Sequence, residues 1–434
     1  MDPVVTAIFV LIYLLTILLS ATKAVPMSIA ALSGALLTAW FGLQYEVFPT
    51  YGDMFTLIES SLPLLGLIIG TMIVVEVAEK SGLFRFGALY AVKISKGKPV
   101  RLFISICVIS AIVSMFLSDP TAMLLMAAAI VTISKLLNYD PIPYFLSATI
   151  MINLGGTSTL IGSTSNMVIG IAAGEQMSFT AFIGYLTACE LALWALTIFA
   201  LYMIFKSRLG KEKPLPEYSP WQSVNNKKLF YRSVLILALL LVLFLASDSI
   251  PNIRPEAVAL GCAILALILS GMDPSEVFKR IDWETVFFIA GFMFVVGGIE
   301  RTELLNGLSS GLVSVAGDNP ATAAIAILWF SGIASAIVSN VAIALTFIPI
   351  IIGTPSLSNP PVWSGLVLGS NLGGATTPLS GSVVVMAMGT LKQEGISMSF
   401  REFTKIGILT SLVQLAFSSF YLFARFGLGG IVSG

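Results

Sequence analysis

Histidine is absent from the chain, and only 11% of its 434 residues are charged. Without histidine, proton relays and metal sites built on imidazole are excluded. Cysteine is scarce, and Cys107, Cys189 and Cys262 stand singly in apolar stretches, which favours packing in the interior over a thiol site for a metalloid. Basic and acidic residues each number 23, so the formal net charge is zero. The sequence predicts no nucleic-acid partner and no protein metal site.

Motifs of enzymes are lacking too. No phosphate-binding P-loop is present, which excludes an intrinsic ATPase, although an external ATPase subunit could couple to the chain. No arrangement of nucleophile and base can be argued either. The sequence therefore predicts a protein that is not an enzyme and that needs no cofactor beyond a coupling ion, H⁺ or Na⁺.

Hydrophobic residues, by contrast, make up 57% of the chain. Because no soluble fold buries so much apolar surface, an all-α polytopic membrane protein is predicted. Uninterrupted apolar segments predict helices at about 4–22, 25–43, 62–79, 180–205, 232–247, 255–271, 283–300 and 403–426. An acidic, aromatic connection that contains Glu46, Asp53 and Glu59 is expected between the second and third helices. The first lacks a basic flank and a small-residue cleavage site, so we expect a retained transmembrane helix.

Four further apolar stretches are interrupted. Residues 101–137 break at Ser118-Asp119-Pro120-Thr121 and residues 320–353 at Ser339-Asn340, and their short arms predict re-entrant hairpins, with two full spans and a surface turn as the alternative. Residues 144–172 and 361–390 each contain Asn-Leu-Gly-Gly, which predicts a broken helix. Unpaired backbone groups are tolerated in lipid only where they line a protein cavity, so the paired breaks indicate a transporter binding site.

The two halves of the chain are similar to one another. A gapless register at an offset of 221 residues pairs Gly70 with Gly291, Glu79 with Glu300, and Ser118 with Ser339. We interpret this as internal duplication, with a first repeat at 1–205, a cytoplasmic linker at 206–231 and a second repeat at 232–434. Each repeat has five transmembrane helices, one re-entrant hairpin and one broken helix. Five crossings per repeat give the second an inverted topology.

Charge predicts the orientation. With the N-terminus outside, all of the 23 basic residues except Arg254, Arg301 and Arg425 fall on the cytoplasmic side. The positive-inside rule strongly prefers this solution. We therefore expect a multi-pass protein of the cell (plasma) membrane with both termini extracytoplasmic.

Polar residues and glycines at the four breaks are the candidate substrate and ion site. Half-helix ends present partial charges that suit small ions and hydroxyl groups. Interhelical hydrogen bonding is the alternative for an isolated residue, but four symmetric clusters favour a site. The candidates are Ser118, Asp119, Thr121, Asn153, Gly155, Gly156, Thr157, Ser158, Thr159, Asn166, Ser339, Asn340, Asn371, Gly373, Gly374, Thr376 and Thr377, with Ser163, Thr164, Thr346, Ser380 and Ser382 as further hydroxyls.

Asp119 is the candidate for coupling to a proton or cation. A carboxyl at a buried hairpin tip is costly when charged, so it should bind a cation or a proton. The aligned residue, Asn340, is neutral, so coupling should be asymmetric. A role as N-cap of a helix starting at Pro120 is the alternative. Glu76 and Glu190 are weaker candidates, and no Lys or Arg is expected in the pocket.

These motifs resemble the ion transporter superfamily, which includes arsenite permeases, NhaD-type Na⁺/H⁺ antiporters, citrate and dicarboxylate transporters and the melanosomal P protein. Residues 153–166 are similar to its Asn-x-Gly-Gly-x-x-Thr-x-Ile-Gly…Asn signature, residues 369–378 to the counterpart, and Asp282-Trp283-Glu284-Thr285 to a further pattern. The resemblance covers nearly the whole chain. It implies scaffold helices around a transport core of two hairpins and two broken helices, often in an elevator-like homodimer.

The residues at the hairpin tips indicate which branch of the superfamily the chain resembles. Dicarboxylate transporters of this superfamily carry Ser-Asn-Thr there, whereas this chain has Ser118-Asp119-Pro120 and Ser339-Asn340-Val341, and Val385 replaces the equivalent of Asn166. Asp at the first tip resembles the arsenite permease and antiporter branches. The resemblance implies arsenite or antimonite efflux coupled to proton entry through Asp119. Alternatives are a Na⁺/H⁺ antiporter, a Na⁺-coupled carboxylate or anion transporter and, in another class, a passive channel or a membrane scaffold.

Overall fold

The computed structural model describes residues 2–22, 25–213, 219–302, 307, 310–311, 313–314, 319–377, 382–393 and 399–427, with backbone alone at 382, 383, 385, 386, 390 and 393. The described residues form helices and no strand. Eight of these helices are long and apolar enough to cross a membrane. The prediction of an all-α polytopic membrane protein is confirmed.

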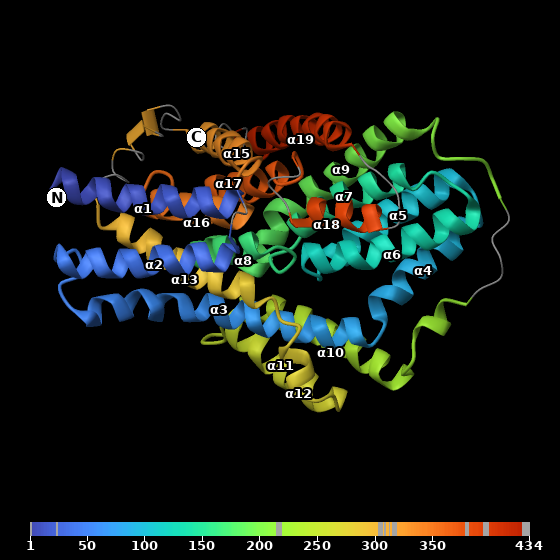
Figure 1. Cartoon of the computed structure of the whole chain (residues 1–434), viewed down its shortest axis with the longest axis horizontal. Helices are drawn as coiled ribbons and strands as arrows, with labels where there is room; N and C mark the ends of the chain where they lie inside the picture. The colour runs from blue at the N-terminus through green and yellow to red at the C-terminus, as the bar shows by residue number, and fades with distance from the viewer. Residues whose placement is uncertain are drawn as a thin grey trace.

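Two groups of helices lie side by side (Figure 1). The scaffold group consists of α1 (Pro3–Thr22), α2 (Met27–Gln44), α3 (Tyr51–Lys80), α10 (Lys227–Ser247), α11 (Pro255–Ser270) and α13 (Trp283–Glu300). The core group consists of α5 (Pro99–Ser114), α6 (Asp119–Leu137), α7 (Pro141–Thr157), α8 (Thr164–Ala173), α9 (Phe179–Phe205), α15 (Pro320–Ser335), α16 (Asn340–Ile352), α17 (Pro360–Gly373), α18 (Ser382–Gln393) and α19 (Phe400–Leu422). Two further helices are α4 (Leu83–Ser95) and α12 (Pro274–Phe278).

Each group is held together by long helix pairs. In the scaffold group α13 packs along α2 and α11 along α3, and in the core group α15 packs along α17 and α5 along α7. Glycine permits the close approach: a Cβ on Gly70 would lie 2.6 Å from the backbone of Ala259, and one on Gly291 would lie 2.7 Å from the backbone of Ala31. The two aligned glycines therefore make the same kind of contact. The duplication and its inverted topology stay a prediction.

The two groups meet along few polar contacts. α3 lies against α8, and α13 lies against α16. The side-chain hydrogen bonds between the groups include Tyr13 with Thr346 and a 3.8 Å contact from Thr71 Oγ1 to Met167 Sδ. Asp248, which follows α10, accepts from Ser178 Oγ at 2.8 Å and from Thr180 N at 2.7 Å at the start of α9. Among the described residues, few hydrogen bonds therefore join the two groups.

The third helix differs from its predicted bounds. We expected it at about 62–79, with an acidic connection before it, but α3 begins at Tyr51. A capping box between Thr50 and Asp53 starts the helix: Asp53 N donates to Thr50 Oγ1, and Thr50 N donates to Asp53 Oδ2. Its 30 residues span roughly 45 Å, so α3 extends beyond a hydrocarbon core about 30 Å thick.

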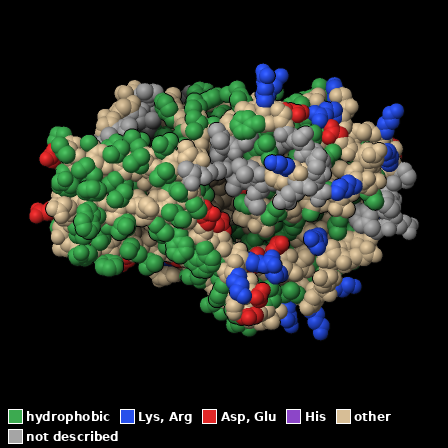
Figure 2. Space-filling view, in the orientation of Figure 1, with side chains coloured by type: hydrophobic (Ala, Val, Ile, Leu, Met, Phe, Trp, Pro, Cys, Tyr) green, Lys and Arg blue, Asp and Glu red, His purple; other side chains and the backbone are tan. Residues whose placement is uncertain are grey.

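Basic residues gather at one end of the molecule. Figure 2 shows Lys and Arg over the right-hand part, near α4, α6 and α10, whereas the left-hand part is mainly hydrophobic. At this end Arg208 bridges Asp140 and Glu402, with N–O distances of 2.8 Å to each. Burial opposes the charged form of Arg208, but hydrogen bonds to Glu402 and Asp140 raise the pKa of the guanidinium above its usual range. The ion pair fastens the start of the linker to the core group.

Candidate substrate and ion site

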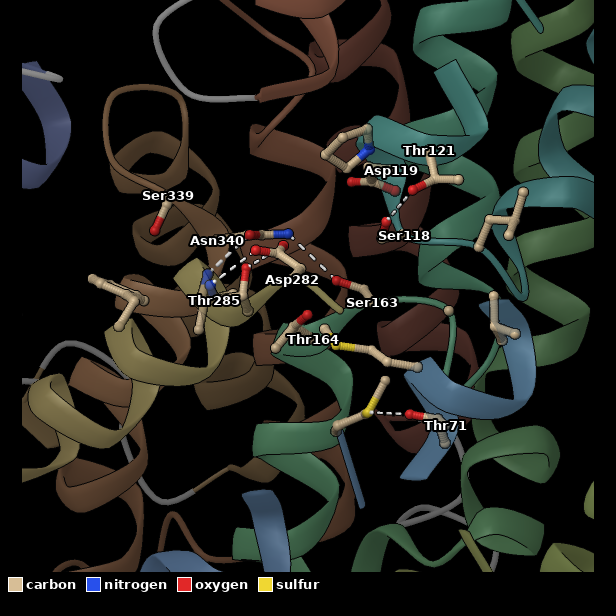
Figure 3. A pocket seen from close by; sticks show the side chains of 18 of the residues that line it. Thr71, Ser118, Asp119, Thr121, Ser163, Thr164, Asp282, Thr285, Ser339 and Asn340 are labelled. Carbon is tan, nitrogen blue, oxygen red and sulfur yellow. Dashed lines mark hydrogen bonds between the residues drawn. The ribbon is translucent and has the colours of Figure 1, made fainter. Parts of the chain in front are cut away.

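Two helical hairpins bring their tips to the middle of the molecule. In the first, α5 ends at Ser114 and α6 begins at Asp119; in the second, α15 ends at Ser335 and α16 begins at Asn340. Ser339 starts α16 as an N-cap whose Oγ accepts from Ala342 N at 3.3 Å. Figure 3 shows the two tips on opposite sides of a pocket, with the start of α8 beside them. The expected hairpin breaks therefore lie at one place in the fold.

A cavity of about 210 Å³ lies between the tips. The core group contributes the tips and the break between α7 and α8, and the scaffold group contributes α1, α3 and the start of α13. Among the predicted site residues, the lining includes Ser118, Asp119, Thr121, Asn153, Ser339, Asn340 and Gly374, joined by Ser163 and Thr164. The cavity thus contains polar groups from both halves of the chain.

Asp119 occupies the first turn of α6 and faces this cavity. Its Oδ1 accepts from Ser114 Oγ at 3.2 Å. A Cβ on Gly156 would lie 3.2 Å from the same oxygen, so glycine leaves room for the carboxyl beside the α7 terminus. The capping alternative is wrong: the helix begins at Asp119 itself, Ser118 is the N-cap residue, and no side chain caps this end. The carboxyl is free for another role.

Three asparagines connect the breaks. Asn371 on α17 donates from Nδ2 to Asn166 Oδ1 at 2.8 Å and to Val367 O at 2.8 Å. Its Oδ1 accepts from Ser165 Oγ at 3.0 Å and from Asn340 Nδ2 at 3.3 Å. Both amide hydrogens and both lone pairs of Asn371 are used. The network holds the second hairpin tip against both broken helices.

Asn166 closes the first break. Its Nδ2 lies 3.1 Å from Gly156 O, 3.4 Å from Thr157 O and 2.7 Å from Thr159 O. Gly156 and Thr157 are the last residues of α7 and Thr159 follows its end, so their carbonyls lack the partners that a continuing helix would supply. Asn166 is fully buried, and its amide replaces hydrogen bonds that the helix no longer supplies. Its position explains why an amide side chain follows the glycines at this spacing.

The other predicted residues lie outside the cavity lining. Hydrogen bonds join Thr157 to Asn153 O, Thr159 to Met115 O, Thr376 to Ser411 and Thr377 to Ala336 O. Ser158 contacts Trp194 and Glu190 on α9. Ser380 is outside the described residues, and so are the side chains of Ser382 and Val385.

Two glycines of the motifs pack helices together. A Cβ on Gly155 would lie 2.2 Å from Ala111 O, and one on Gly373 would lie 2.1 Å from Gly332 O. The first contact joins α7 to α5, and the second joins α17 to α15. In each half, the glycine brings a broken helix against the first arm of the neighbouring hairpin. The motif therefore combines close packing with the end of a helix.

Of the scaffold residues that line the cavity, only Glu76 was a candidate from the sequence, and a weaker one. Thr71, Glu76, Arg280, Asp282 and Thr285 line it. The expectation that no basic residue lies in the pocket is wrong, because Arg280 Nε stands 3.5 Å from Glu76 Oε1 at its edge. Asp282 caps α13, accepting from Thr285 N at 3.1 Å. The signal for these residues was the pattern at 282–285, which the sequence alone did not connect to the hairpins.

Acidic side chains outnumber basic ones in the cavity lining. Among the described residues, Glu76, Asp119 and Asp282 contribute three carboxyl groups, and Arg280 contributes one guanidinium. Arg280 pairs with Glu76, whereas the polar contact of the Asp119 carboxyl is the Ser114 hydroxyl. With all groups ionised, the cavity would carry net negative charge, which attracts cations.

Membrane-crossing helices around a polar cavity, with hairpins that end inside the protein, define a membrane transporter. Residues 11–365 match the profile of the CitMHS family, described as citrate transporter. The chain belongs to this family, within the ion transporter superfamily indicated by its motifs. It is a multi-pass secondary transporter and not an enzyme.

Two relatives that match over nearly their full length are named as transporters, and a third matches over half of its length. The uncharacterized transporter Rv2684 of Mycobacterium tuberculosis is 28% identical over 98% of this chain and 99% of its own. The uncharacterized transporter slr0753 of Synechocystis sp. is 25% identical over 94% of each chain. The P protein of Sus scrofa is 24% identical over 82% of this chain and 52% of its own length. The resemblance to the P protein group is confirmed.

Solved transporter structures share the fold. The YdaH transporter of Alcanivorax borkumensis superposes with a TM-score of 0.64 at 16% identity, covering 98% of this chain and 99% of that one. MtrF of Neisseria gonorrhoeae gives 0.60 at 15% identity, covering 96% and 94%. At this level of identity the likeness concerns the fold alone.

Proposed function

We propose that the cavity between the hairpin tips holds the transported solute and that Asp119 carries the coupling proton or cation. The observation that supports this most is the position of Asp119, at a tip and facing the cavity, with a hydroxyl as its hydrogen-bond partner. An ionised carboxyl deep in a membrane protein needs a proton or a cation to offset its desolvation. Loading and unloading this group would couple its ion to the solute in the same cavity.

Arsenite or antimonite, exported against proton entry, is the substrate that we place first. An acidic lining favours a small uncharged hydroxide over a bare multivalent anion. Thr121, Asn153, Ser339 and Asn340 offer hydroxyl and amide groups to the hydroxyls of such a solute. The volume of about 210 Å³ accommodates a small solute with part of its hydration shell.

Two other solutes are each favoured by one observation. The acidic lining suits Na⁺ directly, which would make the protein a Na⁺/H⁺ antiporter with Asp119 alternating between the two ions. The family description names citrate. A carboxylate would enter this lining only together with cations that neutralise it, so citrate transport would also require cation coupling.

Proton flux in proteoliposomes with an enclosed pH-sensitive dye separates these solutes. Arsenite, antimonite, Na⁺, Li⁺ and citrate are added in turn, with citrate tested alone and with added cations. We expect a response to arsenite or antimonite. A response restricted to Na⁺ and Li⁺ would establish the antiporter instead, and a response restricted to citrate would establish a carboxylate transporter. No proton movement with any of them would contradict coupling to protons.

We also propose the membrane, the orientation, the oligomeric state and the energy source of the protein. The chain lies in the plasma membrane with both termini extracytoplasmic, consistent with the basic end in Figure 2. The family resemblance supports a homodimer. The coupling ion is the energy source that we favour, and an external ATPase subunit is the alternative. Transport that required ATP in reconstituted vesicles would identify the alternative.

A further inference from the structure

Glu190 is a buried carboxyl that the proposed cycle does not yet use. It lies on α9 with 1% of its surface exposed, and it is not part of the cavity lining. Its Oε2 accepts from Ser158 Oγ at a distance of 3.4 Å. Its Oε1 is buried and has no hydrogen-bond partner among the described residues. A carboxylate with one long hydrogen bond and one unpaired oxygen is poorly stabilised in a protein interior.

The hydrogen bonds of Ser158 indicate which form of Glu190 fits. Ser158 Oγ accepts from Trp194 Nε1 at 3.0 Å and also lies 3.4 Å from Leu154 O. One hydroxyl hydrogen cannot serve both Leu154 O and an ionised Glu190. If Glu190 holds a proton, it can donate to Ser158 Oγ, and Ser158 can then donate to Leu154 O. The hydroxyl would make one donated and two accepted bonds, which is its full capacity.

Charged groups near Glu190 do not supply an alternative. The helices packed on α9 are α5, α7, α10, α17 and α19, with the short turn Gly174–Met177. The α7 and α17 sequences contain no Asp, Glu, Lys or Arg. In the others, charged residues stand in the first two turns, namely Arg101 on α5, Lys227, Lys228 and Arg232 on α10, Arg401, Glu402 and Lys405 on α19, and Glu175 in the turn. Two further charged groups contact the N-terminal part of α9: Asp248 accepts from Thr180 N, and Arg425 donates to Gly184 O. The titratable neighbours are the buried thiol of Cys189 and Tyr421, whose hydroxyl donates to Tyr185 O.

We propose that Glu190 is a second proton-binding carboxyl of the transport cycle, placed behind the break between α7 and α8. The inference rests on the proposed function, since it assigns a second proton to the same coupled transport. Ser158 is the C-cap of α7, and residues 162–164 of the same break line the cavity. A rearrangement of the break during solute binding would change the one hydrogen bond that Glu190 has. The proton on Glu190 would then be bound or released together with the solute.

The test compares proton-to-solute ratios in proteoliposomes. Glu190→Gln keeps the shape of the side chain and the polar contact with Ser158, but it cannot exchange a proton. We expect the number of protons moved per solute to fall by one and the pH profile of transport to lose one titration step. Trp194→Phe is the matched control, because it alters the same hydroxyl and leaves the carboxyl, so its ratio should equal that of the wild type. An unchanged ratio and pH profile in Glu190→Gln would overturn the proposal.

A second readout needs neither transport nor a folded Glu190 variant. Infrared spectra of the purified wild-type protein with carboxyl-labelled glutamate report protonated glutamate by its C=O stretch. Ser158→Ala keeps the carboxyl and removes its hydroxyl partner, so it should shift one such band, whereas Ser163→Ala should not. The absence of a band that responds to Ser158→Ala would overturn the assignment. Failure of the proposed function would instead be seen as wild-type vesicles that move no protons with any solute.

Discussion

The side-chain amide of Asn371 donates to the side-chain oxygen of Asn166 at 2.8 Å, and this bond joins the two broken helices across 205 residues of sequence. Both residues belong to the predicted site, yet both are buried beside the cavity and do not line it. Their role is to fix the relative position of the two halves. The cavity-lining residues Asn340 and Ser163 are held through the same network.

Asn371→Leu tests the network. The substitution leaves the amide oxygen of Asn166 and the donors of Ser165 and Asn340 without their buried partner, and leaving such a group unsatisfied costs about 1–3 kcal/mol. We expect a lower thermal unfolding midpoint of the purified protein and loss of transport. Ser370→Ala is the control, since the Ser370 hydroxyl bonds Val367 O on its own helix. Equal midpoints for both variants would contradict the network.

Gly155→Ala and Gly373→Ala test the close packing of the broken helices. Each new methyl group would meet a backbone carbonyl oxygen that cannot move away alone. Overpacking of this kind costs about 1–3 kcal/mol, so both variants should unfold at lower temperature. At Gly184 and Gly261, a Cβ has nothing within 4 Å. Alanine there should be neutral or stabilising, by up to ~1 kcal/mol, and destabilisation of all four variants alike would refute the packing account.

Arg280→Gln tests the electrostatics of the cavity. Removing the guanidinium leaves Glu76 without its partner and makes the lining more acidic. Cation binding should tighten by about 1 kcal/mol, roughly fivefold, because the Arg280 side chain is half exposed and solvent screens the pair. Competition between Na⁺ and the coupling proton, measured as the apparent constant for Na⁺, provides the readout.

The neighbouring Lys279 offers the comparison for that experiment. It pairs with Glu276 at 3.1 Å, and both side chains are more than half exposed. Lys279→Gln should change the apparent constant little, since exposed pairs contribute about 0–1 kcal/mol. A similar change in both variants would show that the effect arises from general surface charge and not from the cavity.

Cysteine labelling tests the orientation. The native residues Cys107, Cys189 and Cys262 are buried, so they should react slowly with a membrane-impermeant maleimide. Ser249 and Ser207 are exposed and lie on opposite sides in the predicted topology. On intact cells, Ser249→Cys should be labelled, whereas Ser207→Cys should react only after the membrane is permeabilised. The reverse pattern would invert the orientation.

The sequence predicted the core side of the site better than the scaffold side. Breaks at Ser118 and Ser339 interrupt apolar runs, so the pattern of one segment is enough to place them. Glu76 and Arg280 come together only because α3 packs near the start of α13, and no local pattern contains that contact. For the same reason Arg280 was taken as a residue of the cytoplasmic surface.

Local competition between signals explains two further differences. Asp before Pro120 is a favoured helix start, yet Ser118 takes the N-cap position and Asp119 becomes the first helical residue. The acidic residues around Asp53 suggested a connection, but the capping box with Thr50 extends α3 through them. In the second case the start of the helix is set by hydrogen bonds between Thr50 and Asp53 that the apolar pattern does not specify.

Asp119→Asn tests the central claim most directly. The variant matches the neutral residue at the second hairpin tip, keeps the size of the side chain and removes the exchangeable proton. Solute-driven proton flux is measured across a range of pH in proteoliposomes, with the exposed Asp273→Asn as a control for the same chemical change. We predict that Asp119→Asn abolishes pH-dependent transport while the protein remains folded, and that Asp273→Asn behaves like the wild type. Solute-driven proton flux with an unchanged pH dependence in Asp119→Asn would contradict the role of Asp119 in coupling.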